Sequence, residues 1–243
     1  MSKWLMNSRR QFLEGFAAAG GSVMLTACLK TPEDTLKKED KIMNRNEKEK
    51  EVSPAEDLMR EHGILKRVLL IYREGIRRID SKENLPPEVL TASANLIRRF
   101  IEDYHEKLEE EHLFPRFRKA GSLIELVDVL EEQHKRGRSL TDTVVRLATP
   151  STIKDRQERT HLRDALQLFV RMYEPHEARE DTVLFPAFRQ IVSSNEYDAL
   201  GEDFEKKEHK LFGDEGFEKN VEEVSRIEKI LGIYDLAQFT TSG

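Results

Sequence analysis

The sequence predicts an all-α fold, an up-down-up-down four-helix bundle with extra helices at the C-terminal end. Two observations lead to this prediction. Charged residues make up 35% of the 243 residues and apolar residues 38%, a mixture that favours helix and gives little support for β-structure. Apolar residues also recur at three- or four-residue steps in four long segments, and the connections between these segments are short. Short connections favour antiparallel neighbouring helices.

The first predicted helix begins after Ser53 and Pro54, which suit the N-cap and the first position of a helix. It is expected to end near Asp80. Its core-facing stripe recurs every three or four residues. The stripe consists of Leu58, His62, Leu65, Leu69, Tyr72 and Ile76.

Prolines and glycines separate the later helices from one another. The three remaining bundle helices are expected at about residues 88–118, after Pro86 and Pro87 and before Gly121; at about 122–147, closed by Pro150; and at about 154–191. Two shorter helices are expected from residue 194 onward, around Gly213 and Gly216. Residues 54–192 would therefore form the bundle, and residues 193–243 a helical extension.

Residues 1–28 are predicted to be an export signal and not a part of the fold. Arg9 and Arg10 form the pair typical of a twin-arginine signal, and the apolar run that follows is too short to anchor permanently in a bilayer. The run ends in Leu-Thr-Ala followed by Cys28, which resembles the lipobox of bacterial lipoproteins. We expect export by the twin-arginine route and a lipid on Cys28, which would hold the protein at a membrane, facing the periplasm or the cell exterior.

Residues 29–53 are rich in Lys, Glu, Asp, Asn and Thr and are expected to be a charged linker. The whole chain has a net charge of −6. Residues 1–27 carry three basic residues and one acidic residue, so their removal would leave −8. No cluster of Lys and Arg stands apart from acidic neighbours, and nucleic acid is therefore not an expected partner.

An internal repeat in the second and fourth helices indicates where the functional site lies. His105 and Glu109 precede a Phe-Pro-x-Phe-Arg run, and His176 and Glu180 precede another, with every matched pair offset by 71 residues. The four aromatic residues of these runs are expected to seal the bundle core. They are Phe114, Phe117, Phe185 and Phe188.

The other two predicted helices each present one histidine, His62 and His134, which are offset by 72 residues. A His and a Glu four residues apart lie on one face of a helix, so both can point into the core. Four imidazoles and two carboxylates are thus expected to converge. Two buried carboxylates facing each other would repel or share a proton, and a pair of bridged cations removes that cost.

In the order of these motifs the chain resembles the hemerythrin family, in its bacterial HHE form, over about residues 55–192. The resemblance implies a non-haem centre of two iron ions. It also implies binding of O2 or a related small ligand, NO or peroxide, for sensing, storage or scavenging at the cell envelope. The implied terminal ligands are His62, His105, His134 and His176, and the implied bridging ligands are Glu109 and Glu180.

One position departs from the oxygen-carrying hemerythrins, which place two histidines four residues apart on the third helix. The residue four beyond His134 is Arg138, so the resemblance implies a more open site and a less secure role as a simple carrier. A further ligand could come from one of four residues: His112, His161, Tyr104 or Tyr173. His112 matches Val183 in the repeat, which favours a packing role.

Other functions stay open from the sequence alone. Family members also act in iron–sulfur or nitrosative-damage repair, and a di-iron oxidase or peroxidase is a further alternative. A ferritin-like site is disfavoured, because that fold uses Glu-x-x-His motifs and two further glutamates. A metal- and O2-binding protein is favoured over a dedicated enzyme, and the sequence does not identify a redox partner.

Overall fold

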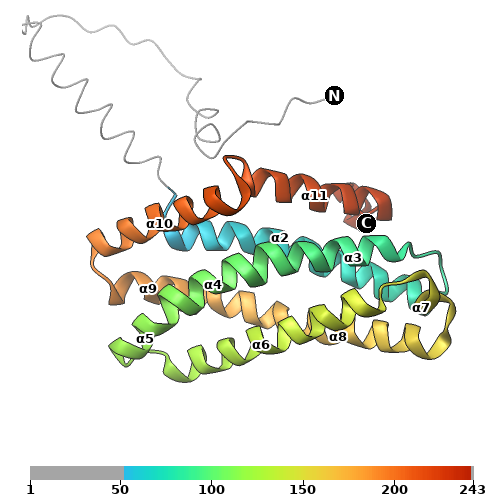
Figure 1. The fold of residues 1–243 in the computed structure, drawn as a ribbon, viewed down its shortest axis with the longest axis horizontal. Coiled ribbons are helices and arrows are strands. Elements are labelled where there is room, and N and C mark those ends of the chain that lie inside the picture. The colour runs from blue at the N-terminus through green and yellow to red at the C-terminus, as the bar shows by residue number, and fades with distance from the viewer. Residues whose placement is uncertain (1–51, 242–243) are drawn as a thin grey trace, which may run out of the picture. The chain divides into compact units, whose positions relative to one another are not determined.

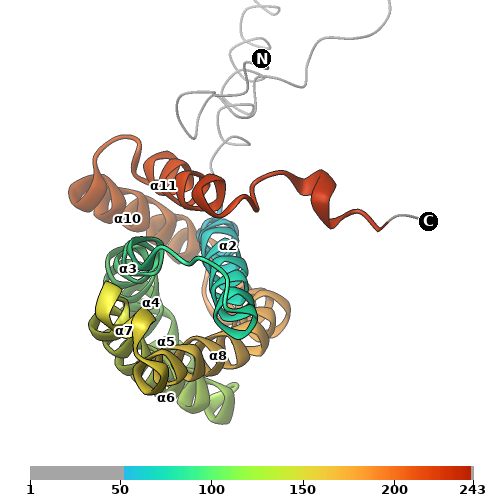
Figure 2. The same cartoon turned by 90° about the vertical axis from the view of Figure 1, so that its right-hand side faces the viewer.

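The structure, a computed structural model, describes residues 52–241, and these contain helices and no strand. Four helical rods lie side by side, and a helical hairpin covers two of them (Figures 1 and 2). The predicted all-α bundle with additional C-terminal helices is confirmed. The export signal with Arg9 and Arg10, the lipobox with Cys28 and nearly all of the linker lie outside the described residues.

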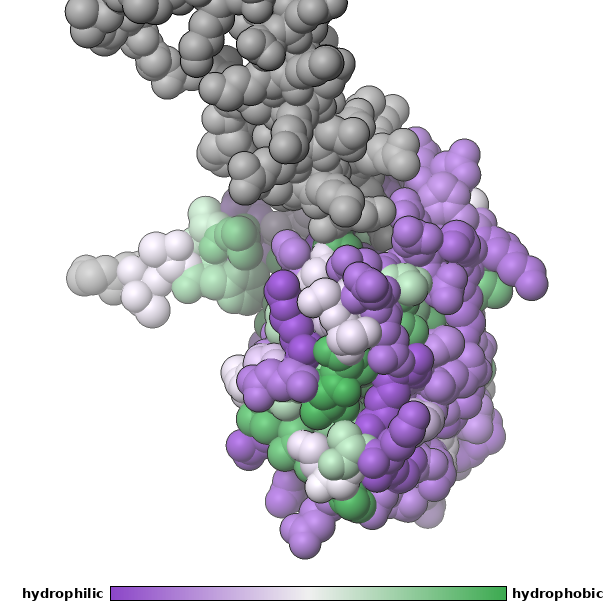
Figure 3. All heavy atoms as spheres, turned by 90° about the vertical axis from the view of Figure 1, so that its left-hand side faces the viewer, coloured by the Kyte–Doolittle hydropathy of each residue, from purple (hydrophilic) through white to green (hydrophobic). Residues whose placement is uncertain are grey.

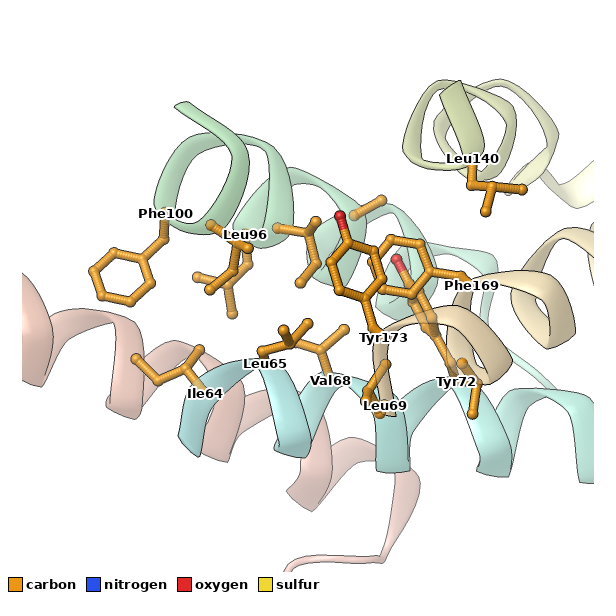
Figure 4. Packing of buried hydrophobic residues seen from close by; sticks show 14 of the residues in the cluster. Ile64, Leu65, Val68, Leu69, Tyr72, Leu96, Phe100, Leu140, Phe169 and Tyr173 are labelled. Atoms are coloured by element: carbon orange, nitrogen blue, oxygen red, sulfur yellow. The ribbon is translucent and has the colours of Figure 1, made fainter. Parts of the chain in front are cut away.

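The first rod is α2, Pro54–Ser81, and it begins at the predicted proline. Acidic side chains in its first turn and Arg78 in its last turn oppose the helix dipole. The predicted apolar stripe is buried against the other rods, apart from Ile76, which is partly buried. In Figure 4 Leu65, Val68 and Tyr72 face the rings of Phe169 and Tyr173.

The second rod covers residues 87–120 but is not a uniform α-helix. Two stretches are wider π-helical turns, and they alternate with ordinary α-helix. The segments are α3 Pro87–Leu96, η2 Ile97–His105 (π), α4 Glu106–Leu108, η3 Glu109–Leu113 (π) and α5 Phe114–Ala120. The rod ends at Gly121, whose φ of 67° is the left-handed conformation that glycine adopts without strain.

The prolines of the repeated motif explain one wide turn in each half. A proline inside a helix lacks an N–H, and its ring crowds the carbonyl four residues earlier. Just before Pro115, the N–H of Phe114 bonds to the carbonyl of Glu109, five residues back. The fourth rod repeats this geometry between Phe185 and Glu180. Wide turns of this kind occur often at functional sites. The two turns that precede the prolines each begin at a predicted ligand, Glu109 or Glu180.

The third and fourth rods are separated by a short helix that the sequence reading did not anticipate. Pro150 begins this helix, because the Thr149 hydroxyl accepts a hydrogen bond from the N–H of Thr152 at 3.2 Å. Asp155 caps the next helix in the same way, accepting from the N–H of Glu158 at 2.8 Å. The segments are α6 Ile124–Leu147, α7 Pro150–Lys154, α8 Arg156–Arg179, η4 Glu180–Leu184 (π) and α9 Phe185–Ile191.

Two helices and a short 3₁₀ turn follow the bundle: α10 Ser194–Phe212, α11 Gly216–Leu231 and η5 Leu236–Phe239. The α10–α11 hairpin packs on α2, and α11 also contacts α3 (Figure 2). Arg67 of α2 ties it down by donating to Glu228 at 2.9 Å. The division into a bundle and an extension at residue 192 stays a prediction.

Surface exposure differs between the bundle and the end of the chain. At the end that carries α5 and α9, polar side chains surround a band of apolar ones (Figure 3). The segment after α11 projects from the bundle, and Leu236 is 80% exposed there. Within residues 52–241 no helix combines the length and the apolar character that crossing a membrane requires.

Candidate metal centre

Four histidines and two glutamates meet in the bundle core, with one histidine from each rod. None of the six side chains is more than 4% exposed. The single histidines come from α2 and α6, the paired ones from η2 and α8, and each glutamate begins a π-helical turn. They are the six residues that the sequence singled out: His62, His105, Glu109, His134, His176 and Glu180.

The imidazoles form two pairs across the core. The ring centroids of His62 and His105 are 4.7 Å apart, and those of His134 and His176 are 5.1 Å apart. We call the first pair the 62/105 half and the second pair the 134/176 half. The Nε2 atoms of both pairs face the two carboxylates.

Each carboxylate lies between the two halves. The Oε1 atom of Glu180 is 3.2 Å from Nε2 of His176, and its Oε2 atom is 3.3 Å from Nε2 of His62. The Oε2 atom of Glu109 is 3.4 Å from Nε2 of His134 and 3.8 Å from Nε2 of His105. A carboxylate that touches a histidine of each half is placed to bridge two cations.

The distances divide the cluster into two overlapping groups of potential ligands. In each group, one ligand atom from every residue lies within 4.8 Å of the others. The first group is His62, His105, Glu109 and Glu180, and the second is His134, His176 and Glu180. Glu180 belongs to both, which is the arrangement that a two-metal site requires.

The Nδ1 atom of each of the four clustered histidines forms a hydrogen bond with an acceptor outside the cluster. Because carboxylate and amide oxygens accept, each Nδ1 carries a proton, and in the neutral imidazole each Nε2 then presents its lone pair to the core. The partners are Asp181 for His62 (2.7 Å), Glu61 for His105 (2.8 Å), Glu110 for His134 (3.2 Å) and the amide oxygen of Gln133 for His176 (2.8 Å).

The sequence reading missed these four acceptors, although they follow the same repeat. Glu61 and Gln133 each precede a single histidine, and Glu110 and Asp181 each follow a bridging glutamate. The offsets of 72 and 71 residues are those of the ligands themselves. Extending the repeat by one residue in each direction would have found them.

A basic residue holds one acceptor in each half. Lys66 Nζ is 3.1 Å from Asp181, and Arg138 donates to Glu110 at 2.6 Å. These two basic residues are also offset by 72, each four residues after a single histidine. Arg138 additionally donates to Glu106 at 2.8 Å. Where the oxygen-carrying hemerythrins would have a fifth histidine, this chain therefore has a guanidinium that pairs with two carboxylates.

The Phe-Pro motifs contribute rings that cover the imidazoles. Phe114 stacks on His134 and Phe185 stacks on His62, with ring centroids 5.5 Å apart in both cases. The second aromatic residues of the motifs, Phe117 and Phe188, are buried and lie 6.0 Å apart by their centroids. The expectation that these four side chains belong to the core is confirmed.

Several buried polar atoms in the cluster lack hydrogen bonds, as expected where side chains are arranged to bind a cation. Among the described residues, both carboxylate oxygens of Glu109 and of Glu180 have no hydrogen-bond partner, and neither do the Nε2 atoms of His105 and His134. Leaving such atoms unsatisfied costs about 1–3 kcal/mol each, and more for charged groups. Divalent cations ligated by imidazole and carboxylate would satisfy all of them. The residues fit a metal centre.

The electrostatics of the cluster agree with this. Burial and the nearby Glu180 raise the pKa of Glu109 well above its usual range. Burial alone would raise the pKa of Glu180 as well, but His176 and His62 outweigh it and hold that pKa well below the usual range. Burial opposes a charge on His62, yet Asp181 and Glu180 raise its pKa to about 9. Without metal, protons therefore neutralise the charges that cations would neutralise.

The candidates for a further ligand lie elsewhere. His161 is exposed and precedes His176 by fifteen residues in α8, about 22 Å along the helix. His112 packs on Phe204 of α10 at a centroid distance of 5.4 Å, which agrees with the packing role that the repeat favours. Tyr104 packs on Phe212 at 5.5 Å.

Tyr173 lies nearer to the cluster. Its ring centroid is 5.3 Å from that of His176. Its hydroxyl donates to Glu106 at 2.7 Å. The phenol therefore contacts Glu106, the carboxylate that also pairs with Arg138, and is not directed at the clustered ligands.

Comparison with known proteins agrees with this geometry. The family model described as the hemerythrin HHE cation binding domain matches residues 53–152 and 126–232. Uncharacterized proteins of Mycobacterium bovis and of two strains of Mycobacterium tuberculosis are 49% identical over 234 residues, covering 96% of this chain and 91% of theirs. No solved structure matches.

Proposed function

The chain belongs to the hemerythrin HHE cation-binding family, and on this basis we propose that it is a non-haem di-iron protein that binds O2 or a related small ligand, NO or peroxide. The observation that carries the proposal is the set of buried Glu and His atoms without hydrogen bonds, which belong to two overlapping groups of ligands in the core. His62 and His105 would hold one ion, and His134 and His176 the other. Glu109 and Glu180 would bridge them.

The protein's own residues prepare this site. Each Nδ1–H···O hydrogen bond fixes the tautomer and the orientation of an imidazole before any metal arrives. Phe114 and Phe185 cover two of the rings and exclude water from one side. Bound ferrous iron supplies electrons and open coordination positions to a small ligand. The chain would supply four histidines and two carboxylates for two ions, which leaves such positions.

The first test is the metal content of the full chain purified from an iron-supplied host. We expect about two iron atoms per chain, and we expect Glu109→Ala and Glu180→Ala each to lose the pair. Glu132→Ala, which removes an exposed carboxylate two residues before His134, is the matched control and should keep both. A wild-type protein with no iron, or with a single zinc ion, would contradict the proposal.

Ligand binding is tested next on the reduced, iron-loaded protein under controlled gas. A charge-transfer band that appears with O2 or NO and disappears when the gas is removed supports a role in sensing, storage or scavenging. Irreversible oxidation with continued consumption of O2 or peroxide would contradict a binding role and favour a di-iron oxidase or peroxidase.

We also propose that the protein acts at the cell envelope. Arg9 and Arg10, the apolar run and the lipobox ending in Cys28 stand in the order of a twin-arginine lipoprotein signal. Cys28→Ser should release the protein from the membrane fraction, and replacement of both arginines by lysine should keep it in the cytoplasm. Unchanged distribution of both variants would refute this placement.

A further inference from the structure

The two halves of the centre differ in one pair of acceptors. In the 62/105 half, both histidines donate their Nδ1 protons to carboxylates, His62 to Asp181 and His105 to Glu61. In the 134/176 half, His134 donates to the carboxylate of Glu110, but His176 donates to an amide oxygen. The repeat thus places a carboxylate at residue 61 and a neutral amide, that of Gln133, at the matching position.

The basic residues increase this difference. Two cations contact Glu110, Arg138 at 2.6 Å and Lys107 at 2.5 Å. Arg138 is shared with one further carboxylate, that of Glu106. In the other half, the described residues place one cation beside Asp181 in addition to its histidine, the half-exposed Lys66 at 3.1 Å. Among the described residues, Glu110 therefore has more cationic contacts than Asp181, its counterpart in the repeat.

The buried environment of Glu61 points in the same direction. Its carboxylate, with those of Asp57 and Glu208, forms a group in which one oxygen of each residue lies within 4.8 Å of the others. All three side chains are buried. The 134/176 half also holds a group of this kind, but it contains two carboxylates, those of Glu106 and Glu110, with His134, and Arg138 contacts both carboxylates.

An imidazole that donates to a carboxylate is a more basic ligand than one that donates to an amide. A more basic ligand stabilises the more highly charged state of a bound ion. The position at the 62/105 half should therefore favour the ferric ion more strongly than the position at the 134/176 half.

We infer that Glu61 and Gln133 are positioning residues that make the two metal positions unequal. Acting through His105, Glu61 lowers the reduction potential of the ion in the 62/105 half. Acting through His176, Gln133 keeps the other potential higher. On one-electron oxidation the 62/105 half loses its electron first, and the 134/176 half, beside Arg138, keeps the ferrous ion. This inference rests on the proposed di-iron function.

The test is an anaerobic potentiometric titration of the iron-loaded full chain, with the half-oxidised form followed by electron paramagnetic resonance. Wild type, Glu61→Gln, Gln133→Glu and the double variant carrying both changes are compared. Changes of this kind around a metal commonly alter affinity by 10–100-fold. A tenfold change in the preference for ferric over ferrous ion corresponds to about 59 mV for one electron.

The two single variants should move the reduction potentials in opposite directions, and both should narrow the gap between the two potentials. Glu61→Gln should raise the lower potential, and Gln133→Glu should lower the higher one, each by about 59 mV if the preference changes tenfold. The gap between the two steps therefore narrows in both. In the double variant the gap should reopen, because the carboxylate and the amide have exchanged halves.

A purely structural role would not produce this pattern, since loss of packing does not shift two potentials in opposite senses. Glu132→Gln removes the same charge from the exposed neighbour of Gln133 and should leave both steps where they are in wild type. A gap that stays constant, or that widens in Gln133→Glu, overturns the inference while two bound irons still uphold the proposed function. A wild-type chain that binds no iron pair overturns both.

Discussion

Gly137 of α6 is the position where one added methyl group should do the most damage near the site. A Cβ atom there would lie 1.9 Å from the Tyr173 hydroxyl oxygen and 2.7 Å from the ring carbon that bears it. Real Cβ atoms do not approach so closely, so Gly137→Ala must displace the phenol. Because Tyr173 is fully buried between rods, its ring has little room to move (Figure 4).

The magnitude follows from three contributions. Overpacking of a filled core costs about 1–3 kcal/mol. Moving the phenol also breaks the 2.7 Å hydrogen bond from Tyr173 to Glu106, and a bond to a charged group is worth about 1.5–3 kcal/mol. Alanine in place of glycine within a helix returns about 1 kcal/mol. The net loss in the free energy of unfolding is therefore about 1.5–5 kcal/mol.

The assay is urea denaturation of the full chain without metal, followed by circular dichroism. Gly63→Ala is the matched control, because Gly63 lies in α2 beside His62, is exposed, and has nothing within 4 Å of an added Cβ. This control should gain about 1 kcal/mol from helix propensity alone. Tyr173→Phe removes the atom in closest contact, so in combination with Gly137→Ala it should cost less than the sum of the two single changes.

A Gly137→Ala variant that is as stable as wild type, or that gains stability as Gly63→Ala does, would refute the predicted clash with Tyr173. Strict additivity in the double variant would refute it too, because the two positions would then not be in contact.

Burial, opposed by a hydrogen bond from Thr141, raises the pKa of Glu102 to about 7. The folded state then holds this proton more tightly than the unfolded state, so stability should fall by about 3 kcal/mol as pH rises from about 4.5 to 7. Glu102→Gln should flatten that slope in urea titrations at several pH values, and parallel profiles would refute it. Asp181→Asn should weaken iron binding by about tenfold in competition with a chelator, because His62 loses a charged acceptor; an unchanged affinity would show that the charge has no effect. Phe185→Ala should cost about 3–5 kcal/mol in the free energy of unfolding of the metal-free chain, whereas the exposed Phe239→Ala should change it by less than about 0.5 kcal/mol; equal effects would contradict the packing of Phe185 on His62.

Local signals were sufficient to predict the helices and their order. The apolar stripe of α2 and the positions of Pro54 and Gly121 are properties of a few neighbouring residues, and each has one clear structural meaning. Pro150 was less clear, because a proline can follow one helix or begin the next. Thr149 decides between these, since its hydroxyl caps the short helix α7.

The wide turns could not be predicted from periodicity. A π-helical turn of five residues, such as Glu109–Leu113, shifts the apolar pattern too little to distinguish it from an α-helix. The informative residue was Pro115, whose missing N–H and bulky ring require a local change in hydrogen bonding. Its counterpart Pro186 follows the equivalent turn, Glu180–Leu184, in the fourth rod.

The six clustered residues were predictable because an exact repeat marked them, whereas the acceptors behind them were hidden by two effects. Adjacent helical residues point about 100° apart, so Glu61 seems to face away from the site when only α2 is considered. It reaches the site because His105 comes from a different rod. Glu61 and Gln133 also differ chemically, so a search for identical residues passes over them.

Arg138 shows how the structure changes the meaning of a missing residue. From the sequence, its position was notable only because it lacks the fifth histidine of oxygen carriers. In the structure it has a counterpart, Lys66. Each of the two basic residues forms an ion pair with a carboxylate, and that carboxylate accepts a hydrogen bond from a histidine of the cluster. A neutral imidazole at residue 138 could not pair with both Glu106 and Glu110, and it would leave two carboxylates beside the site less well compensated. The absence of a fifth histidine and the presence of two basic–carboxylate–imidazole chains are therefore parts of one electrostatic arrangement.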